Sequence, residues 1–189
     1  IYNMTIQTTP QNEGALLLKN VFDFLGAALL VVLLSPLFIC ISIAIKVFAG
    51  GSVLYRQERL GLNGRKFMVY KFRTMIENAD ELRKELVEMN EADGPVFKIK
   101  EDPRIIPYVG TFLRKTSLDE LPQLINVLKG EMSLVGPRPP IPKEVGEYVI
   151  WQRRRLSMKP GMTCFWQIAP RRNELSFEDW VKMDLEYID

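Results

Sequence analysis

An uncharged apolar run from Phe24 to Ile45 constrains this chain of 189 residues more than any other feature. As a helix, the run would be roughly 33 Å long, which suffices to cross the ~30 Å hydrocarbon core of a bilayer once. It is too long for the apolar part of a secretory signal, and no cleavage site with small residues follows it. The sequence therefore predicts a membrane segment.

A proline near the middle of this run leaves two topologies open. Pro36 follows Ser35, and a proline inside a helix removes a backbone hydrogen bond and clashes with the preceding turn, so we expect a bend. Each arm would then be on the order of 15 to 18 Å long. A re-entrant hairpin becomes feasible beside an ordinary kinked spanning helix. Charge does not decide between them, because basic residues flank both ends of the run.

The composition excludes several kinds of chemistry. The chain has no histidine, which removes Ser-His-Asp and Cys-His catalysis and most zinc sites. Its two cysteines, Cys40 and Cys164, form neither a disulfide framework nor a metal-ligand spacing, and we expect the soluble part in the cytoplasm. A net charge of +2 is too small to indicate a nucleic-acid partner. Without a glycine-rich nucleotide fingerprint, chemistry falls to carboxylates, Lys, Arg, Tyr, Ser or Cys.

A basic β-hairpin is expected between Val53 and Met75. Alternating apolar residues flank an Asn63-Gly64 turn. Six basic residues against the single acid Glu58 suit anionic headgroups or a substrate phosphate, although a solvated basic face explains them too. Apolar residues at three-and-four spacing then predict an amphipathic helix within 74–92.

Asp119 and Glu120 stand where the sequence predicts the start of a helix. Ser117 and Glu120 fit a capping box, and an apolar stripe continues to Leu128 before Gly130. Unpaired backbone N–H groups and the helix dipole favour an ionised carboxylate there and would also attract a phosphate. The position suits a carboxylate nucleophile, but acids in a first helical turn are also ordinary helix-start chemistry.

Later segments offer further binding candidates. Arg138 lies between two prolines, so a stiff backbone displays a guanidinium suited to bidentate phosphate recognition. Lys159-Pro160-Gly161 predicts a type II turn. Beyond it, Trp166, Gln167 and Arg171 are candidates for a wall around a base or sugar, with core packing as the alternative for Trp166.

In combination, these segments closely resemble the bacterial sugar transferase family, the monotopic phosphoglycosyl transferases that begin glycoconjugate assembly. The resemblance covers about Leu16 to the end of the chain, and the ordered combination of motifs is far more specific than any one motif. The motifs that show this resemblance are the Ser35-Pro36 pair, Tyr70–Arg73, Leu113–Gln123 and Ser133–Pro139.

The resemblance implies an α+β fold in which a re-entrant membrane helix precedes a small mixed helical domain with a β-hairpin, lying on the membrane surface. The expected division is a linker or the end of an upstream region at 1–15, a membrane helix broken at Ser35 and Pro36 at 16–48, and a catalytic domain at 49–189. By the same resemblance, this domain lies on the cytoplasmic face of the bacterial inner membrane. The ends of the chain suggest a family domain cut from a longer protein.

The resemblance also implies a reaction. Asp119 would attack the sugar-linked phosphate of a UDP-sugar, release UMP and form a covalent phospho-sugar intermediate, which polyprenyl (undecaprenyl) phosphate then resolves to initiate exopolysaccharide assembly. Glu120 would assist. Mg²⁺, with Asp119 as its expected ligand, would neutralise phosphate charge. The expected phosphate-binding residues are Lys71, Arg73, Arg114 and Arg138, and the expected nucleotide or sugar contacts are Gln167 and Arg171.

Departures from the family pattern leave the sugar open. Cys164 replaces a usual glycine, and Ala169-Pro170 replaces a usual pair of a small polar residue and glycine. Membrane lipids are expected partners, and a homodimer stays open. Two rivals also remain: a non-catalytic membrane scaffold that holds anionic lipid or a partner, and a spanning-helix enzyme that attacks another phosphate donor.

Overall fold

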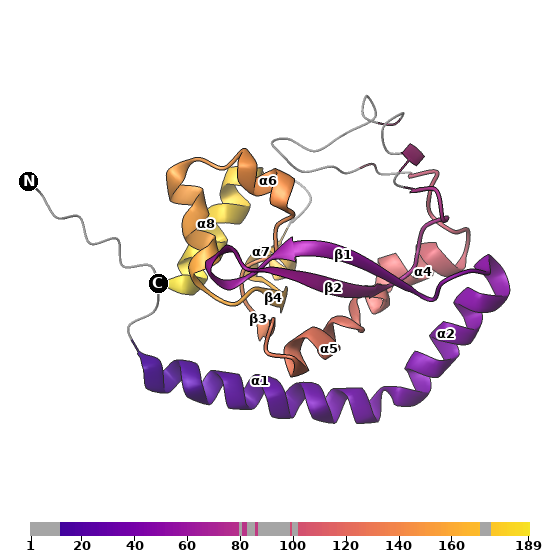
Figure 1. Cartoon of the computed structure of the whole chain (residues 1–189), viewed down its shortest axis with the longest axis horizontal. Coiled ribbons are helices and arrows are strands. Elements are labelled where there is room, and N and C mark those ends of the chain that lie inside the picture. The colour runs from indigo at the N-terminus through magenta and orange to yellow at the C-terminus, as the bar shows by residue number, and fades with distance from the viewer. Residues whose placement is uncertain (1–11, 80, 83–85, 87–98, 100–101, 171–174) are drawn as a thin grey trace, which may run out of the picture.

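The computed structural model describes residues 12–79, 81–82, 86, 99, 102–170 and 175–189. Two apolar helices lie along the edge of a small mixed domain that contains a β-hairpin (Figure 1). The prediction of an α+β protein, with an apolar helical segment ahead of a small helical domain with a hairpin, is confirmed. Most of the helix predicted within 74–92 lies outside the described residues.

The apolar segment is broken where the sequence places its proline. Helix α1 spans Glu13–Leu33 and helix α2 spans Ser35–Ala49. Pro36 stands in the first turn of α2, where its missing N–H would have had no helical partner. The Ser35 hydroxyl donates to the Val32 carbonyl at 2.8 Å. Figure 1 shows the two helices meeting at a bend. Among the helices of the described residues, α1 is the one that is long and apolar enough to cross a membrane.

A polar cluster fastens α1 to the domain. Asp23 is buried and accepts hydrogen bonds from the Ser133 hydroxyl at 2.6 Å and the Leu134 backbone at 3.2 Å. Lys19 forms an ion pair with the same carboxylate at 2.9 Å. One turn further on, Ala27 is buried in the core of the domain. Lys19 and Asp23, the charged residues next to the apolar run, are thus paired with each other and with the domain.

The predicted hairpin and its turn are confirmed. Strands β1 (Leu54–Leu60) and β2 (Lys66–Phe72) pair antiparallel, with Leu54 opposite Phe72 and Leu60 opposite Lys66. A 3₁₀ turn, η1 (Leu62–Gly64), closes the hairpin. Asn63 and Gly64 have φ values of 56° and 72°, and these residue types tolerate the left-handed region that a tight hairpin turn requires.

The rest of the domain consists of short elements. In chain order they are α4 (Val109–Thr116), η3 (Leu118–Glu120), α5 (Gln123–Leu128), β3 (Ser133–Val135), α6 (Pro142–Gly146), η4 (Ile150–Ser157), β4 (Gly161–Thr163), α7 (Phe165–Ile168) and α8 (Phe177–Ile188).

The predicted type II turn at Lys159-Pro160-Gly161 is wrong, because Gly161 opens strand β4 and lacks the positive φ that such a turn needs. Strands β3 and β4 are parallel, with Ser133 opposite Gly161. A Cβ at Gly161 would lie 2.1 Å from the Gly136 backbone nitrogen. The lack of a side chain at Gly161 therefore allows its backbone to approach the Gly136 backbone closely.

The hairpin and the apolar helices share the core of the protein. One cluster of buried residues joins α1 to β2 and α5, and a second joins α2 to β2 and α4. Val69 belongs to the first cluster and Phe72 to the second. Strand β2 therefore contacts both arms of the apolar segment.

Asn126 fixes helix α5 against the free edge of β2. Its side chain is fully buried and accepts a hydrogen bond from the Tyr70 backbone at 3.1 Å. Its amide group donates to the Met68 carbonyl at 2.7 Å and to the Glu131 carboxylate at 2.7 Å. The side chain thus satisfies backbone groups that a third strand would otherwise pair.

We expect Asn126→Ala to lower the free energy of unfolding by about 2 to 4 kcal/mol, because buried backbone groups of β2 lose their partners. Thermal unfolding of the detergent-solubilised protein measures the change. Asn20→Ala, at an exposed asparagine of α1 that accepts one surface hydrogen bond from Lys159, is the matched control and should change the melting temperature far less. Equal melting temperatures for the two variants would contradict the assigned role of Asn126.

Candidate active site

A cavity of about 770 Å³ lies along one face of the hairpin. Tyr55, Gln57 and Arg59 alternate along β1 and line it, because side chains two apart on a strand point to the same face. Lys71, the partner of Tyr55 in β2, lines it as well. The hairpin therefore forms one long wall of the site.

Most of the candidate residues from the sequence meet in this cavity. Ser35 and Pro36 lie instead at the junction of α1 and α2, and Arg171 lies outside the described residues. The candidates that line the cavity are Lys71, Arg73, Arg114, Asp119, Glu120, Arg138, Trp166 and Gln167.

Lys71 and Glu120 form the central contact of the site. The Lys71 Nζ atom lies 2.5 Å from Glu120 Oε1, and each side chain is 27% exposed. This ion pair joins strand β2 to the turn η3. Charge-assisted contacts of this length are among the stronger hydrogen bonds in proteins. Glu120 is therefore held in a fixed position beside Asp119.

Asp119 occupies an environment that penalises its charge. Desolvation by burial raises the pKa of its carboxyl group above the usual 3.8, and the neighbouring Glu120 adds to the rise. Lys71 and Arg114 act in the opposite direction. A carboxylate that is poorly solvated but close to cations is suited to react with an electrophile that brings its own negative charge.

The predicted capping box at Ser117 and Glu120 is wrong. Ser117 ends α4 in the left-handed conformation, with φ 58° and ψ 17°, and among the described residues its side chain caps no helix. Asp119 and Glu120 occupy the separate turn η3, ahead of α5, which starts at Gln123. Left-handed non-glycine residues are strained and cluster at functional sites.

The pattern of η3 explains why its two acids face the cavity. Leu118 and Leu121 pack on the core cluster that contains Phe72 and Leu113. Residues three apart share a face of a 3₁₀ turn. With these leucines facing the core, Asp119 and Glu120 fall on the remaining faces and line the cavity.

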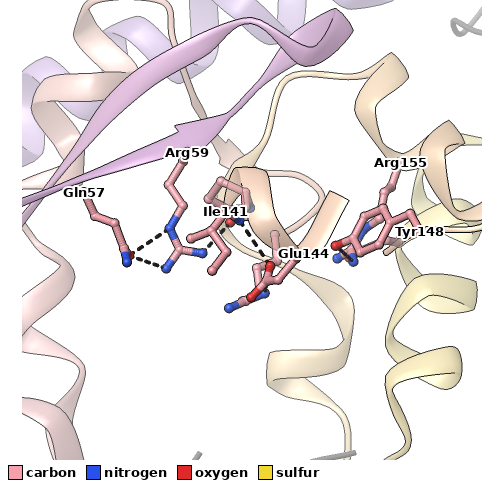
Figure 2. A network of polar contacts seen from close by, with 9 residues as sticks. Gln57, Arg59, Ile141, Glu144, Tyr148 and Arg155 are labelled. Carbon is pink, nitrogen blue, oxygen red and sulfur yellow. Dashed lines mark hydrogen bonds and ion pairs between the residues drawn. The ribbon is translucent and has the colours of Figure 1, made fainter. Parts of the chain in front are cut away.

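Arg59 and Arg138 form a second group of cationic side chains, at the end of the cavity next to α6. Glu144 is almost fully buried and accepts hydrogen bonds from Arg138 and from the Ile141 backbone, each at 3.2 Å. Arg59 donates to Gln57 Oε1 at 2.6 and 3.0 Å and to the Pro139 carbonyl at 2.9 Å. Figure 2 shows Arg59 between Gln57 and the segment of Ile141 and Glu144.

Arg59 was missed as a site residue by the sequence reasoning, which counted it only as one basic residue of the hairpin. Burial and the nearby Arg138 lower its pKa to about 10. Within the described part of the chain, no carboxylate forms an ion pair with it. Its alternation with Tyr55 and Gln57 on β1 was the available signal. An anionic ligand would relieve the repulsion between the two arginines.

A smaller chamber of about 80 Å³ adjoins the main cavity. Its charged wall residues are Arg59, Lys71, Arg138 and Glu120. Lys71 is paired with Glu120 and Arg138 with Glu144, so Arg59 supplies the positive charge that has no carboxylate partner among the described residues. Its size and charge suit a phosphoryl group.

Arg73 has structural contacts within the cavity wall. Its guanidinium forms an ion pair with Glu77 at 3.0 Å and donates to the carbonyls of Ala49, at 3.2 Å, and Gly50. The side chain is 6% exposed. Arg73 thereby fastens the end of α2 to the end of β2, and its phosphate-binding role stays a prediction.

The donor atoms fit a metal ion that is shared with a substrate. No group of three or more potential metal ligands occurs among the residues that the structure describes. Mg²⁺ commonly binds through one or two carboxylates together with substrate phosphates and water. Asp119 and Glu120 provide two carboxylates beside a cation-rich cavity. This set suits Mg²⁺ bound with a diphosphate better than a preformed metal cage.

We expect Asp119→Asn to keep or raise the melting temperature at pH 7. A raised pKa means that the folded protein binds the proton more tightly than the unfolded chain, so ionised Asp119 costs stability above its folded pKa. The gain should shrink as the pH falls toward 3.8, the usual aspartate value. Melting curves at pH 7 and pH 5 test this.

Asp179→Asn provides a control of opposite sign. Hydrogen bonds from Ser176 lower the pKa of Asp179, so its ionised form stabilises the fold above the unfolded pKa, and its replacement should lower the melting temperature at pH 7. A clearly lower melting temperature for Asp119→Asn would contradict the assigned desolvation.

Known proteins share this sequence along most of its length. The galactosyl transferase CpsE of Streptococcus agalactiae is 45% identical over 179 residues, covering 92% of this chain and 38% of the relative. The exopolysaccharide production protein ExoY of Sinorhizobium fredii is 42% identical, covering 95% of this chain and 82% of the relative. The undecaprenyl-phosphate galactose phosphotransferase of Salmonella typhimurium is 40% identical, covering 98% of this chain and 39% of the relative.

The chain thus spans well under half the length of the Streptococcus and Salmonella relatives, but most of the length of the Sinorhizobium relative. A family model described as bacterial sugar transferase matches residues 14–189. That match includes both apolar helices and every described element of the cavity. The chain therefore belongs to the bacterial sugar transferase family.

Proposed function

We propose that this protein transfers a sugar-1-phosphate from a UDP-sugar to polyprenyl phosphate, with Asp119 as the nucleophile. The observation that carries the proposal is the desolvated Asp119 carboxylate in a cavity whose other charged walls are mainly cationic. The relative from Salmonella typhimurium is named for phosphotransfer of galactose to undecaprenyl phosphate, which supports a lipid phosphate as the acceptor.

In the first half-reaction, an Asp119 carboxylate oxygen attacks the phosphorus that carries the sugar. The bond from this phosphorus to the bridging oxygen breaks, and UMP leaves with the electron pair. Lys71, Arg114 and Arg138 line the same cavity and offset the charge on the non-bridging oxygens and the leaving phosphate. Mg²⁺ held by Asp119, with Glu120 beside it, would supply further charge neutralisation.

In the second half-reaction, an oxygen of polyprenyl phosphate attacks the phosphorus of the aspartyl phospho-sugar. The bond from Asp119 to phosphorus breaks, which restores the carboxylate and yields a sugar diphosphate lipid. Glu120 contributes by holding the Lys71 ammonium group next to the reacting phosphate. The chemistry needs no imidazole, in keeping with a chain that contains no histidine.

The two ends of the apolar segment support a re-entrant topology. Asp23, in the middle of α1 and just ahead of the apolar run, fastens this helix to β3 of the domain, and Arg73 fastens the end of α2 to the same domain. Only Phe24–Leu33 separates Asp23 from the break, which is about 15 Å of helix, or half the hydrocarbon core. We therefore place the domain and both helix ends on one membrane face, and the family resemblance favours the cytoplasmic face of the inner membrane.

Asp119→Asn should abolish UMP release, and Glu120→Gln should reduce it by at least a hundredfold, because the first removes the nucleophile and the second frees Lys71. Incubation of the parent with a panel of UDP-sugars, without acceptor, should add the mass of one sugar phosphate to the intact protein. Glu186→Gln, at an exposed acid of α8, should retain full activity. Undiminished UMP release by Asp119→Asn would refute the nucleophile assignment, and lipid binding without turnover would favour a scaffold.

Both ends of the apolar segment should escape labelling from outside the cell. The test uses Glu13→Cys and Lys66→Cys, separately, in a Cys40→Ser background that retains the buried Cys164. A membrane-impermeant thiol reagent should label neither variant in spheroplasts and both after permeabilisation. Labelling of one end in intact spheroplasts would show that the segment spans the membrane.

A further inference from the structure

The cavity has two chemically different ends. Ser52 and Arg73 lie at the end next to α2, whereas Arg59 and Glu144 lie at the end next to α6. Seven residues of extended chain separate Ser52 from Arg59, or about 23 Å. Lys71, opposite Tyr55 in the hairpin, lies between these ends with Glu120 bound to it. A substrate centred on Asp119 can therefore extend in two directions.

Two stacked tryptophans line the cavity together with the Arg59 group. Trp166 comes from α7 and Trp180 from α8, and their rings are parallel to within 14° with centroids 4.4 Å apart. Both indole nitrogens are buried and have no hydrogen-bond partner within the described part of the chain. Unpaired buried donors cost stability, so hydrogen bonding within the described residues does not account for this arrangement.

Trp180 packs on an apolar cluster that lies beside a buried polar network. Arg155 forms an ion pair with Asp184 of α8, and both side chains are 1% exposed. Arg155 also donates to the Tyr148 hydroxyl at 3.0 Å, a contact visible in Figure 2. Trp180 packs on the apolar cluster of Tyr148, Phe177 and Val181. A rigid aromatic surface loses little entropy when a flat ligand stacks on it.

We propose that Trp166 and Trp180 form the platform for the nucleobase of the donor, a role that rests on the proposed function. The phosphates belong among the cations around Asp119, and Arg59 and Arg138 continue this positive charge toward α6. The acceptor's lipid tail must come from the apolar helices, which meet the cavity at the Ser52 end. The opposite end is left for the water-soluble nucleoside, whose planar base stacks well on an aromatic ring.

The intrinsic fluorescence of the full chain tests this platform. The chain has three tryptophans, and the third, Trp151, is 40% exposed and does not line the cavity. In a Trp151→Phe background, emission therefore comes from the stacked pair alone. Titration with UMP should change this emission, whereas ribose 5-phosphate, which has the ribose and phosphate but no base, should leave it unchanged. An equal response to both probes would overturn the proposal.

Affinity for UMP gives a second readout. Trp166→Leu and Trp180→Leu should each weaken UMP binding at least tenfold by calorimetry, whereas Trp166→Phe should retain part of the affinity and Trp151→Phe all of it. Affinities within twofold of the parent for both leucine variants would overturn the platform. The fluorescence titration needs no change to the pair, so it stays decisive if a leucine variant fails to fold.

Failure of the platform and failure of the transferase reaction are distinguishable. The UMP titration is repeated in Asp119→Asn, which should bind UMP through the tryptophan pair without turnover. A parent protein that forms the phospho-sugar adduct while both leucine variants keep its KM for the UDP-sugar would overturn the platform alone. A parent protein that binds UMP at the pair but forms no adduct with any UDP-sugar would overturn the reaction alone.

Discussion

The hydrogen bonds of one buried asparagine hold the candidate catalytic turn against the hairpin. Asn126 binds the backbone of β2 on either side of Val69, which sets the position of α5 and of the turn that precedes it. Lys71 follows directly in β2 and meets Glu120 at 2.5 Å. A shift of α5 along this edge would carry η3 and Glu120 away from Lys71, so the active-site contact depends on hydrogen bonds that are themselves outside the cavity.

Electrostatics and burial act in opposite directions within the cavity. Burial disfavours both the ionised Asp119 and the protonated Arg59. Both side chains line the same cavity, but they form no direct ion pair with each other. A diphosphate would lie between these charges and compensate the cations. An anionic substrate would therefore remove the part of the electrostatic cost that falls on Arg59, while Lys71 and Arg114 offset its repulsion with Asp119. This balance favours binding of anions over neutral sugars.

Local sequence signals predicted the elements whose geometry is set locally. Asn63-Gly64 dictates the hairpin turn, and Pro36 dictates the helix break. Local signals failed where long-range contacts determine the backbone conformation. Ser117 adopts a left-handed conformation to join α4 to η3, and Gly161 allows a close approach to the Gly136 backbone. The convergence of the candidate side chains on one cavity followed from the family resemblance, since the local pattern left Asp119 open between a carboxylate nucleophile and an ordinary helix-start acid. Arg59 and Trp180 were missed because their neighbours are distant in sequence.

Arg73 belongs both to the cavity wall and to the end of the membrane helix. Together with the two core clusters that join β2 to α1 and α2, this side chain holds the site at a set distance from the apolar segment. The phosphate of a polyprenyl lipid also lies at a fixed depth, because its tail stays in the hydrocarbon layer. Enzyme and acceptor would therefore meet by lateral diffusion within one plane, and the search for the acceptor is reduced from three dimensions to two.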